Sequence, residues 1–450
     1  MDQWDVAIIG GGILGTSTAF WLADQYDARI VLLEKERDVA EHTSRRNTGV
    51  IHRPFYLDPK SRRIFARSAQ AAYGMWKQYA QARGLPFKPV GTFEVAVTPD
   101  QTSRVKKYYN WGLENGMQPD ELELLTAEEV KKYEPHVHCY GAVWSKTDTA
   151  VDYRTFTRSL RRDAEQRGAV FRTGTMVKSI KPTTDGINIR TTNDDNVKTR
   201  FLINCAGGNS LNVAHMLGVG MQYTDLNFRG EYWTIRKDQY HLANHNIYTI
   251  PKHPELPFLD PHWIIRADGR REVGPSALPV TGPYTYHGFF RDPIELIQKL
   301  LEPPVMNKLA VLVNRDFLQL AMEEWKSALS KKEWAKRIQE FLPEMKVEYL
   351  AKPGTAGVRA SVIDEKGNFL KEAIELEGPN SYHITNYNSP GATGAPAFSA
   401  WIVNKLASMG RLDHLHPRSK PFKGLWDYES VSEGVGGSSS ATTLSIAAHN

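Results

Sequence analysis

The chain has 450 residues, and at about 150 residues per domain this length predicts two or three domains with ample hydrophobic cores. Hydrophobic residues make up 41% and charged residues 24% of the chain, which is ordinary globular usage and excludes a low-complexity protein. Fifty-six Lys and Arg against 51 Asp and Glu give a formal net charge of only +5, and no run of about five like charges occurs, so a dedicated nucleic-acid-binding protein is disfavoured.

Cysteine usage and the first segment of the chain indicate the cellular compartment of the protein. The only two cysteines, Cys139 and Cys205, exclude a disulfide framework and any cysteine-based zinc or iron–sulfur site, so we expect no metal and a reducing compartment. Residues 5–23 are apolar, but Asp2 and Asp5 stand where a signal peptide would be cationic. No apolar run is long enough to span a bilayer. We therefore expect a cytoplasmic protein, with peripheral attachment to the inner face of a membrane left open.

The predicted elements begin with a β-α-β unit. Residues 5–9 are a short β-branched run, residues 10–15 a glycine turn, residues 16–25 have helical spacing, and residues 30–33 are a second buried-strand run. Helical and strand patterns then alternate, which predicts an α/β fold. Helices are expected at about 60–83, 126–133 and 153–167, and strands at about 91–97, 141–144, 170–180, 187–191 and 201–204.

The second half of the chain has different patterns. Residues 220–285 are rich in Pro, Tyr, His and Trp with strand-like pieces, which predicts an antiparallel sheet. Residues 293–342 are dominated by helix formers and indicate surface helices, although Trp325 and Trp334 leave open a face for a membrane or a partner. The tail at 432–450 is rich in Gly, Ser, Thr and Ala, so about the last 20 residues are expected to be disordered.

The glycine turn carries a dinucleotide-binding motif. Gly10-Gly11-Gly12-Ile13-Leu14-Gly15 fits G-x-G-x-x-G between a predicted strand and a predicted helix. Its three motif glycines allow the tight turn, the approach of a pyrophosphate and the packing of helix on strand, and the helix start supplies N–H groups to the phosphates. Glu34 ends the second strand, where a carboxylate accepts hydrogen bonds from ribose hydroxyls. The long insertion before the strand at 201–204 and the small residues after it favour FAD over a nicotinamide cofactor.

Four blocks of residues carry a resemblance to a known family. They are Asn47-Thr48-Gly49-Val50-Ile51-His52; Phe228-Arg229-Gly230-Glu231-Tyr232; Pro257-Phe258-Leu259 with His262, Asp268-Gly269 and Val273-Gly274-Pro275-Ser276-Ala277; and 327–343 with Gly357-Val358-Arg359-Ala360, Ser389-Pro390 and Ala392-Thr393. Over about residues 5–405 they resemble the flavoprotein family of L-2-hydroxyglutarate dehydrogenases and oxidases, of the D-amino-acid-oxidase-like fold. Arg46, Pro261 and Gly391 depart from the family pattern near the expected pocket, which leaves the identity of the acid substrate open.

The resemblance implies a split Rossmann-type FAD-binding domain interleaved with a mainly antiparallel substrate-binding domain. The FAD-binding domain is expected at 1–90, 145–220 and 350–410, the substrate-binding domain at 91–144 and 221–349, and a C-terminal extension at 411–450. The FAD, held non-covalently, is expected to contact Gly10, Gly12, Ile13, Leu14, Gly15, Glu34, Lys35, Ser44, Arg45, Arg46, Asn47, Gly49, Val50, Val177, Ala206, Gly207, Gly357, Arg359, Pro390, Gly391, Ala392 and Thr393.

Oxidation of a 2-hydroxy acid requires a base, cations for carboxylates and a hydride acceptor. His52 and His262 are the two candidate bases, because imidazole titrates near neutrality. Arg359 is expected to bind a carboxylate through two parallel N–H groups, a geometry that lysine cannot supply. The further candidate substrate-binding residues are Arg53, Tyr56, Arg229, Tyr232 and Asn388.

The expected reaction is oxidation of a small 2-hydroxy acid to its 2-oxo acid, with L-2-hydroxyglutarate implied by the resemblance. The alternatives are a flavin dehydrogenase for malate or glycerol 3-phosphate, then an amine or amino-acid oxidase, and last a flavin-binding protein without turnover. The partners are a small anionic substrate and an electron acceptor, which is a quinone, oxygen or another protein. Peripheral membrane contact through helices at 317–338 is a further hypothesis.

Overall fold

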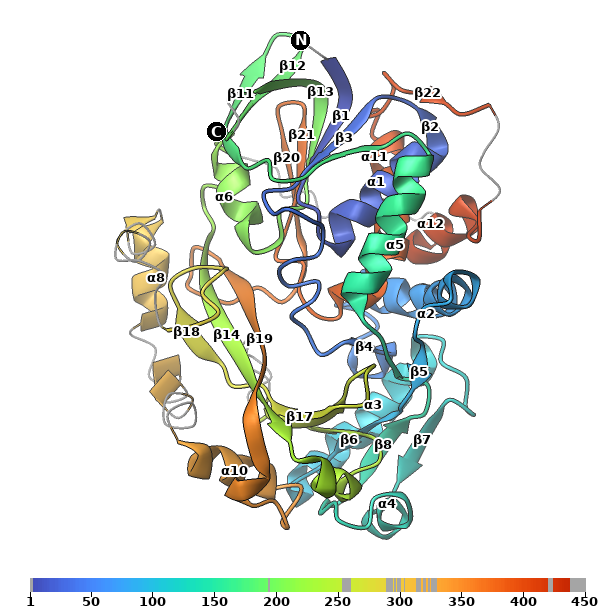
Figure 1. Cartoon of the computed structure of the whole chain (residues 1–450), viewed down its shortest axis with the longest axis vertical. Helices are drawn as coiled ribbons and strands as arrows, with labels where there is room; N and C mark the ends of the chain where they lie inside the picture. The colour runs from blue at the N-terminus through green and yellow to red at the C-terminus, as the bar shows by residue number, and fades with distance from the viewer. Residues whose placement is uncertain are drawn as a thin grey trace.

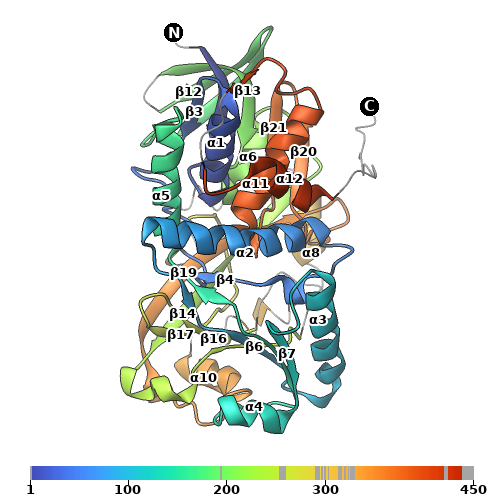
Figure 2. The same cartoon turned by 90° about the vertical axis from the view of Figure 1, so that its right-hand side faces the viewer.

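The computed structural model describes residues 3–192, 195–252, 260–288, 294, 297, 301–302, 304–312, 317–318, 321–322, 324, 330–419 and 424–437. Two sheets build the upper and lower halves of the molecule (Figure 1), and one long helix, α2 (Arg63–Arg83), crosses the molecule between them (Figure 2). The predicted α/β class is confirmed. None of the described helices is long and apolar enough to cross a membrane.

The first sheet has eight strands and is parallel at its centre. They are β1 (Gln3–Ile9), β3 (Ile30–Leu33), β10 (Val170–Arg172), β11 (Val177–Thr183), β12 (Gly186–Thr191), β13 (Asn196–Asn204), β20 (Ile374–Gly378) and β21 (Ser381–Thr385). Strand β1 pairs in parallel with β3 and with the later strand β13, so Ile8 lies opposite Leu32 and Ile203. A central parallel strand is covered on both faces, which explains why β1 ends as an unbroken apolar run rather than an alternating one.

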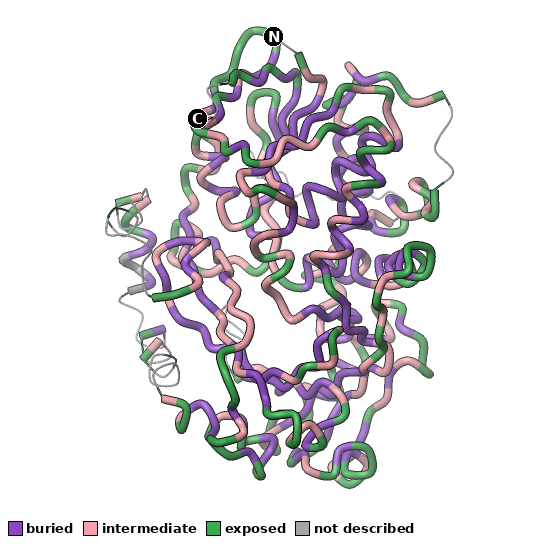
Figure 3. Tube along the Cα trace, in the orientation of Figure 1, coloured by how far each residue is buried: buried purple, intermediate pink, exposed green. Residues whose placement is uncertain are grey.

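Helices cover one face of this sheet. They are α1 (Ile13–Gln25), α5 (Tyr153–Gln166), α11 (Gly391–Ser408) and α12 (Tyr428–Gly436), with α2 packed below them (Figure 2). Trp21, Trp76, Phe156 and Phe398 fill the core between helices and sheet. Figure 3 shows much of the centre of the upper half as buried, and α1 and α11 are buried along most of their length. The short segments η3 (Gly207–Asn209) and α6 (Ser210–His215) follow β13.

The second sheet has nine strands in the order β18-β14-β17-β16-β15-β6-β8-β7, with β19 also paired to β14. They are β6 (Thr92–Val95), β7 (Leu122–Leu125), β8 (Ala142–Ser145), β14 (Thr224–Ile235), β15 (Asn246–Thr249), β16 (His262–Ile265), β17 (Arg271–Gly274), β18 (Leu278–Val280) and β19 (Leu350–Ile363). All these pairs are antiparallel except β15 with β6. The long pair β14 and β19 leads from the lower half toward the upper half (Figure 1).

The remaining elements surround these sheets. They are α3 (Thr102–Glu114), α4 (Ala127–Tyr133), α8 (Val305–Leu312), α10 (Lys331–Gln339), η1 (Pro54–Tyr56), η2 (Pro99–Gln101), η4 (Lys237–Leu242), η5 (Val347–Tyr349), β2 (Tyr26–Asp27), β4 (Val50–Ile51), β5 (Lys88–Pro89), β9 (Thr149–Ala150) and β22 (His416–Pro417). Helix α4 begins with a capping box, in which Thr126 Oγ1 accepts from Glu129 N and Glu129 accepts from Thr126 N.

Three sequence predictions need correction. The single strand predicted at about 170–180 is two strands, β10 and β11, because residues 173–176 leave the ladder between them. Helix α12 extends to Gly436, so the prediction of disorder is wrong for residues 432–436, where Val435 is buried against the core; residues 438–450 lie outside the described residues. Trp334 is only 1% exposed inside the core of the second sheet and therefore offers no membrane face, while Trp325 lies outside the described residues.

Candidate active site

Two cavities meet at the start of helix α1. The larger, of about 330 Å³, lies between the two sheets and is lined from α1, β6, β14, β16, β19 and the start of α11. The smaller, of about 110 Å³, lies at the carboxyl ends of β1 and β3. Residues that line both are Thr43, Ser44, Cys205, Gly207 and Gly208. One elongated ligand can therefore reach from the end of the parallel sheet to the second sheet, at a place where α/β folds bind nucleotides.

The glycine turn lies at the junction of the cavities. Gly10 has φ +106°, and a Cβ there would lie 2.4 Å from the Cys205 carbonyl oxygen. A Cβ on Gly15 would lie 2.0 Å from the Gly10 oxygen, so this glycine is required for packing α1 on β1. Gly12 precedes α1 and lines the smaller cavity, while Ser44 Oγ accepts from Ile13 N at 2.9 Å. The bare helix start facing both cavities fits a pyrophosphate.

Glu34 lies at the end of β3 and lines the smaller cavity with Lys35 and Val177. Its Oε2 accepts from Gly11 N at 2.6 Å and its Oε1 from Glu36 N at 2.8 Å. Burial, only partly opposed by these two hydrogen bonds, raises the pKa of the Glu34 carboxyl. Each oxygen keeps a second lone pair, so the carboxylate can also accept from ribose hydroxyls.

Most of the other expected cofactor residues line one of the cavities. The larger cavity has Ile13, Leu14, Ser44, Arg46, Asn47, Val50, Gly207, Gly357, Arg359, Pro390, Gly391, Ala392 and Thr393, and the smaller has Gly10, Gly12, Glu34, Lys35, Val177 and Ala206. Arg45 lines neither, because its guanidinium pairs with Glu41 near the surface, so we withdraw it as a cofactor contact. Gly49 also lines neither; it has φ +69° and accommodates the backbone of Val151.

His52 is paired with a carboxylate, Asp148, which no sequence motif had indicated. The short antiparallel pair of β4 and β9 sets Ile51 opposite Thr149, so the next residues along, His52 and Asp148, are neighbours. His52 Nδ1 lies 3.0 Å from Asp148 Oδ2, and Asp148 is fully buried. Because a carboxylate only accepts, Nδ1 carries the hydrogen and Nε2 carries the lone pair.

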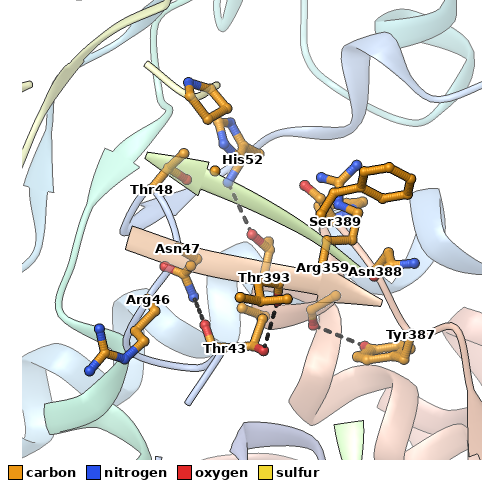
Figure 4. Close-up of a pocket in the computed structure, with 18 of the residues that line it drawn as sticks. Thr43, Arg46, Asn47, Thr48, His52, Arg359, Tyr387, Asn388, Ser389 and Thr393 are labelled. Carbon is orange, nitrogen blue, oxygen red and sulfur yellow. Dashed lines mark hydrogen bonds between the residues drawn. The ribbon is translucent and has the colours of Figure 1, made fainter. Parts of the chain in front are cut away.

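Further hydrogen bonds fix both members of the pair. Asp148 also accepts from Thr92 Oγ1 at 2.9 Å and from Ser145 Oγ at 2.6 Å. The His52 backbone N donates to Thr393 Oγ1 at 3.1 Å, the dashed contact in Figure 4. Its Nε2 lies 3.5 Å from the Tyr248 hydroxyl, too long for a strong hydrogen bond. His52 is therefore a firmly held imidazole that lines the larger cavity and, within the described part of the chain, has only this long contact at Nε2.

His262 has a different environment. Its Nδ1 lies 3.2 Å from the Asp260 carbonyl oxygen, its Nε2 lies 3.2 Å from the Tyr232 hydroxyl, and its ring stacks on Tyr248 with centroids 3.9 Å apart. Burial lowers the pKa of His262 to about 3. A carbonyl only accepts, so Nδ1 donates and Nε2 accepts from Tyr232. The ring is neutral with its lone pair already used, which favours His52 as the base.

Arg359 lies in β19 opposite Phe228 of β14, and its side chain lines the larger cavity. Figure 4 shows it beside Ser389 and Asn388, in the same pocket as His52. Burial, with a smaller contribution from the nearby Arg62 guanidinium, lowers the pKa of Arg359. A guanidinium that has lost contact with water gains more binding free energy from an anionic ligand than an exposed guanidinium does.

The other candidate substrate residues divide into two groups. Tyr56, Tyr232 and Asn388 line the larger cavity. Arg53 and Arg229 do not, because each is used within the protein. Arg53 is 1% exposed and forms two hydrogen bonds to Glu121, and Arg229 pairs with Glu231 at 2.9 Å. We therefore withdraw Arg53 and Arg229 as ligands of a substrate carboxylate.

A dinucleotide cradle that opens onto a cavity with a histidine–carboxylate pair and an arginine defines a flavin-dependent oxidoreductase. The chain belongs to the FAD dependent oxidoreductase family, whose profile matches residues 5–405. Its cofactor is FAD, and it is an enzyme. Among the described residues no group of three or more His, Cys, Asp and Glu is arranged to hold a metal.

Three relatives are L-2-hydroxyglutarate dehydrogenases. The L-2-hydroxyglutarate dehydrogenase of Escherichia coli (strain K12) is 31% identical over 411 residues, which cover 90% of this chain and 94% of the relative. The mitochondrial L-2-hydroxyglutarate dehydrogenase of Caenorhabditis elegans is 29% identical over 92% of this chain and 95% of its own. The human mitochondrial protein of that name is 28% identical over 90% of this chain and 89% of its own.

Solved structures share the fold at lower identity. L-α-glycerophosphate oxidase from Mycoplasma pneumoniae with FAD bound has a TM-score of 0.68 at 22% identity, covering 94% of this chain and 98% of its own. Glycine oxidase from Geobacillus kaustophilus has a TM-score of 0.66 at 16% identity, covering 91% of this chain and 95% of its own. The predicted fold class, an α/β fold with parallel and antiparallel sheets, is thereby confirmed.

Gly12→Val is expected to give a folded protein that purifies without flavin. A valine side chain would extend from a Cβ position 3.2 Å from Ser44 Oγ and occupy the space at the helix start that the pyrophosphate needs. The measurement is the ratio of flavin absorbance to protein absorbance, with acid extraction to identify the released nucleotide. Gly74→Val is the matched control, because nothing lies within 4 Å of a Cβ there. Full FAD occupancy in the Gly12 variant would contradict the placement of the pyrophosphate.

Proposed function

We propose that the enzyme oxidises the CH–OH group of a small 2-hydroxy acid to the 2-oxo acid, with L-2-hydroxyglutarate as the leading substrate. The observation that carries the proposal is that Arg359 and His52, the latter held by the buried Asp148, line one cavity that adjoins the dinucleotide cradle. The shared name of the relatives supports the choice of acid.

Each residue has a defined task. Arg359 binds the C1 carboxylate through parallel N–H groups and so orients C2 in the cavity. His52 accepts the proton of the C2 hydroxyl at Nε2, and Asp148 holds the ring in the required tautomer and stabilises the resulting cation. FAD, held by the glycine turn, Glu34 and the residues of the two cavities, supplies a hydride acceptor when bound.

The direct test is anaerobic reduction of the bound flavin by a panel of acids. L-2-Hydroxyglutarate is expected to bleach the visible flavin absorbance, with the 2-oxo acid formed in equal amount. Malate, glycerol 3-phosphate and L-amino acids at the same concentration form the comparison set. Bleaching by an amino acid or glycerol 3-phosphate, and not by any 2-hydroxy acid, would contradict the proposal.

The electrons then pass to an acceptor, for which a quinone, oxygen and another protein are the candidates. A quinone acceptor would suit a cytoplasmic enzyme attached to the inner face of a membrane. Exposed apolar side chains in one stretch of the chain support membrane attachment. Their exposed fractions are 66% for Ile294, 67% for Leu301, 72% for Met306 and 56% for Met322.

Membrane attachment predicts that the protein sediments with liposomes. Binding is expected to depend on the apolar side chains and therefore to persist at high salt, with Met306→Asp weakening it. Liposome sedimentation at low and high salt, with Met216→Asp as an exposed control elsewhere, measures this. Absence of sedimentation at either salt concentration would remove the membrane from the proposal.

A further inference from the structure

A buried acid, Glu94, faces the larger cavity and has no task in the mechanism above. It lies in β6, where Phe93 and Val95 point into the core of the second sheet and Thr92 and Glu94 point to the opposite face, toward the cavity. Glu94 is only 6% exposed. Among the described residues its carboxyl has no hydrogen-bond or ion-pair partner. An unpartnered buried acid that borders a cavity calls for a ligand.

The groups that face Glu94 come from several elements. Tyr56 lies in η1, Tyr108 in α3, Asp148 between β8 and β9, and Asp260 just before β16. None of these is a cation. Burial, and then the two neighbouring aspartates, raise the pKa of Glu94 well above its ordinary value. The raised pKa favours the protonated carboxylic acid, which has one O–H group to donate.

Arg359 and Glu94 line the cavity from separate strands of the second sheet, β19 and β6, with β14, β17, β16 and β15 between them. The cationic side chains that line it, within the described part of the chain, are Arg46 and Arg359. Arg46 packs on the Tyr286 ring, 3.9 Å from its centroid, and hydrogen-bonds the Ala356 oxygen. Arg359 is the proposed partner of the C1 carboxylate, and Glu94 offers a protonated donor at another place on the same cavity. A buried carboxylic acid kept neutral is a known means of donating a hydrogen bond to an oxygen that bears negative charge.

We propose that Glu94 is a specificity residue that donates a hydrogen bond to the end of the substrate remote from C2. The substrate class is then a 2-hydroxy acid whose far end is a hydrogen-bond acceptor, such as a second carboxylate, while Arg359 holds the first. The inference rests on the proposed function and adds to it the partner of the far end.

The proposal fixes the sign of a pH effect. When Glu94 loses its proton, its carboxylate neither donates to a second carboxylate nor tolerates its charge. The KM for L-2-hydroxyglutarate is therefore expected to rise with pH by about 10- to 100-fold, the size of a lost hydrogen bond to a charged group. The effect falls on KM rather than kcat, because the far end is bound alike in the ground state and the transition state.

The experiment compares the parent with Glu94→Gln and Glu94→Leu. Glutamine keeps a donor and cannot ionise, so its KM is expected to lose the pH dependence, whereas leucine is expected to have a KM about 10- to 100-fold higher than the parent near neutral pH. Glu128→Gln, an exposed acid in α4, is the matched control and should keep the parental profile. A parallel titration follows the flavin spectrum with glutarate, which has no hydroxyl to oxidise, and with pentanoate, which has no second carboxylate. In the parent, only the Kd of glutarate should rise with pH, and Glu94→Gln should remove that rise.

A measurement without substrate tests the proton itself. A carboxyl whose pKa is raised by folding binds more proton in the native than in the unfolded state, so the free energy of unfolding falls as pH rises from the ordinary carboxyl range through the native pKa. The parent is therefore expected to lose Tm relative to Glu94→Gln as pH rises. A Tm difference that is independent of pH would overturn the proposal.

The other outcomes separate this inference from the proposed function. Two results would overturn the role of Glu94. One is a pH profile of KM for Glu94→Gln that matches that of the parent. The other is preferred oxidation of a 2-hydroxy acid with an ammonium group at its far end, such as 6-amino-2-hydroxyhexanoate. A failure of the proposed function would give a different result: L-2-hydroxyglutarate would not reduce the flavin of the parent at any pH. In that case the Kd values of glutarate and pentanoate decide the role of Glu94.

Discussion

His52→Ala is expected to slow reduction of the bound flavin by L-2-hydroxyglutarate about 100- to 10,000-fold, the usual loss when a general base is removed. The loss should appear in the reduction step rather than in substrate affinity, because Arg359 still holds the C1 carboxylate. Anaerobic stopped-flow measurement of the flavin absorbance over a pH series gives both the rate constant and the apparent pKa of the step. In the variant, the part of the pH dependence that comes from the general base should be lost.

His262→Ala is the matched control for this prediction. His262 is a neutral ring with a pKa of about 3, and its Nε2 already accepts from Tyr232, so its removal should disturb packing against Tyr248 more than proton transfer. The rate of flavin reduction in Asp148→Asn should lie between the rates of His52→Ala and His262→Ala. An amide oxygen still accepts from Nδ1 but carries no charge to stabilise the protonated ring. If His52→Ala and the parent reduce at the same rate with the same pH profile, the proton leaves to another group.

Local sequence signals predicted the β-α-β unit that builds one half of the candidate site. The glycine turn, the helix after it and Glu34 lie within one β-α-β unit, where spacing alone brings them together. Helix α11 is a contrasting case. It starts with Gly391 and Gly394 in its first turn and contains Pro396, and these residues hide its helical pattern although the helix is almost fully buried.

The substrate half depends on contacts between distant segments. Asp148 becomes the partner of His52 through the pairing of β4 with β9, and nothing in the residues around either predicts that register. Arg53 fits a ligand role by type, but Glu121, far away in sequence, occupies its guanidinium. Glu94 alternates with apolar neighbours, a pattern that predicts a solvent-facing strand residue. In the structure, η1 and α3 cover that face of the strand.

Arg359→Ala is expected to lower kcat/KM for L-2-hydroxyglutarate by roughly 30- to 1,000-fold, because the loss of a buried two-pronged contact to a carboxylate costs on the order of 2 to 4 kcal/mol. Arg359→Lys should recover little of this loss, since an ammonium group cannot supply two parallel N–H groups. The backbone at this position is fixed in the β14–β19 ladder, so the change should act on the cavity and leave the fold intact. Steady-state kinetics together with the Tm of each variant provide the measurement.

Lys352→Ala, which removes an exposed cation from the same strand, is the matched control and should keep parental kinetics. The substrate panel separates the two ends of the cavity. Loss of Arg359 should affect every 2-hydroxy acid alike, because all of them share the C1 carboxylate, whereas loss of the Glu94 donor should affect only acids with an acceptor at the far end. If Arg359→Ala instead spares 2-hydroxypentanoate and weakens only L-2-hydroxyglutarate, the arginine binds the far carboxylate, and the substrate lies in the cavity in the reverse orientation.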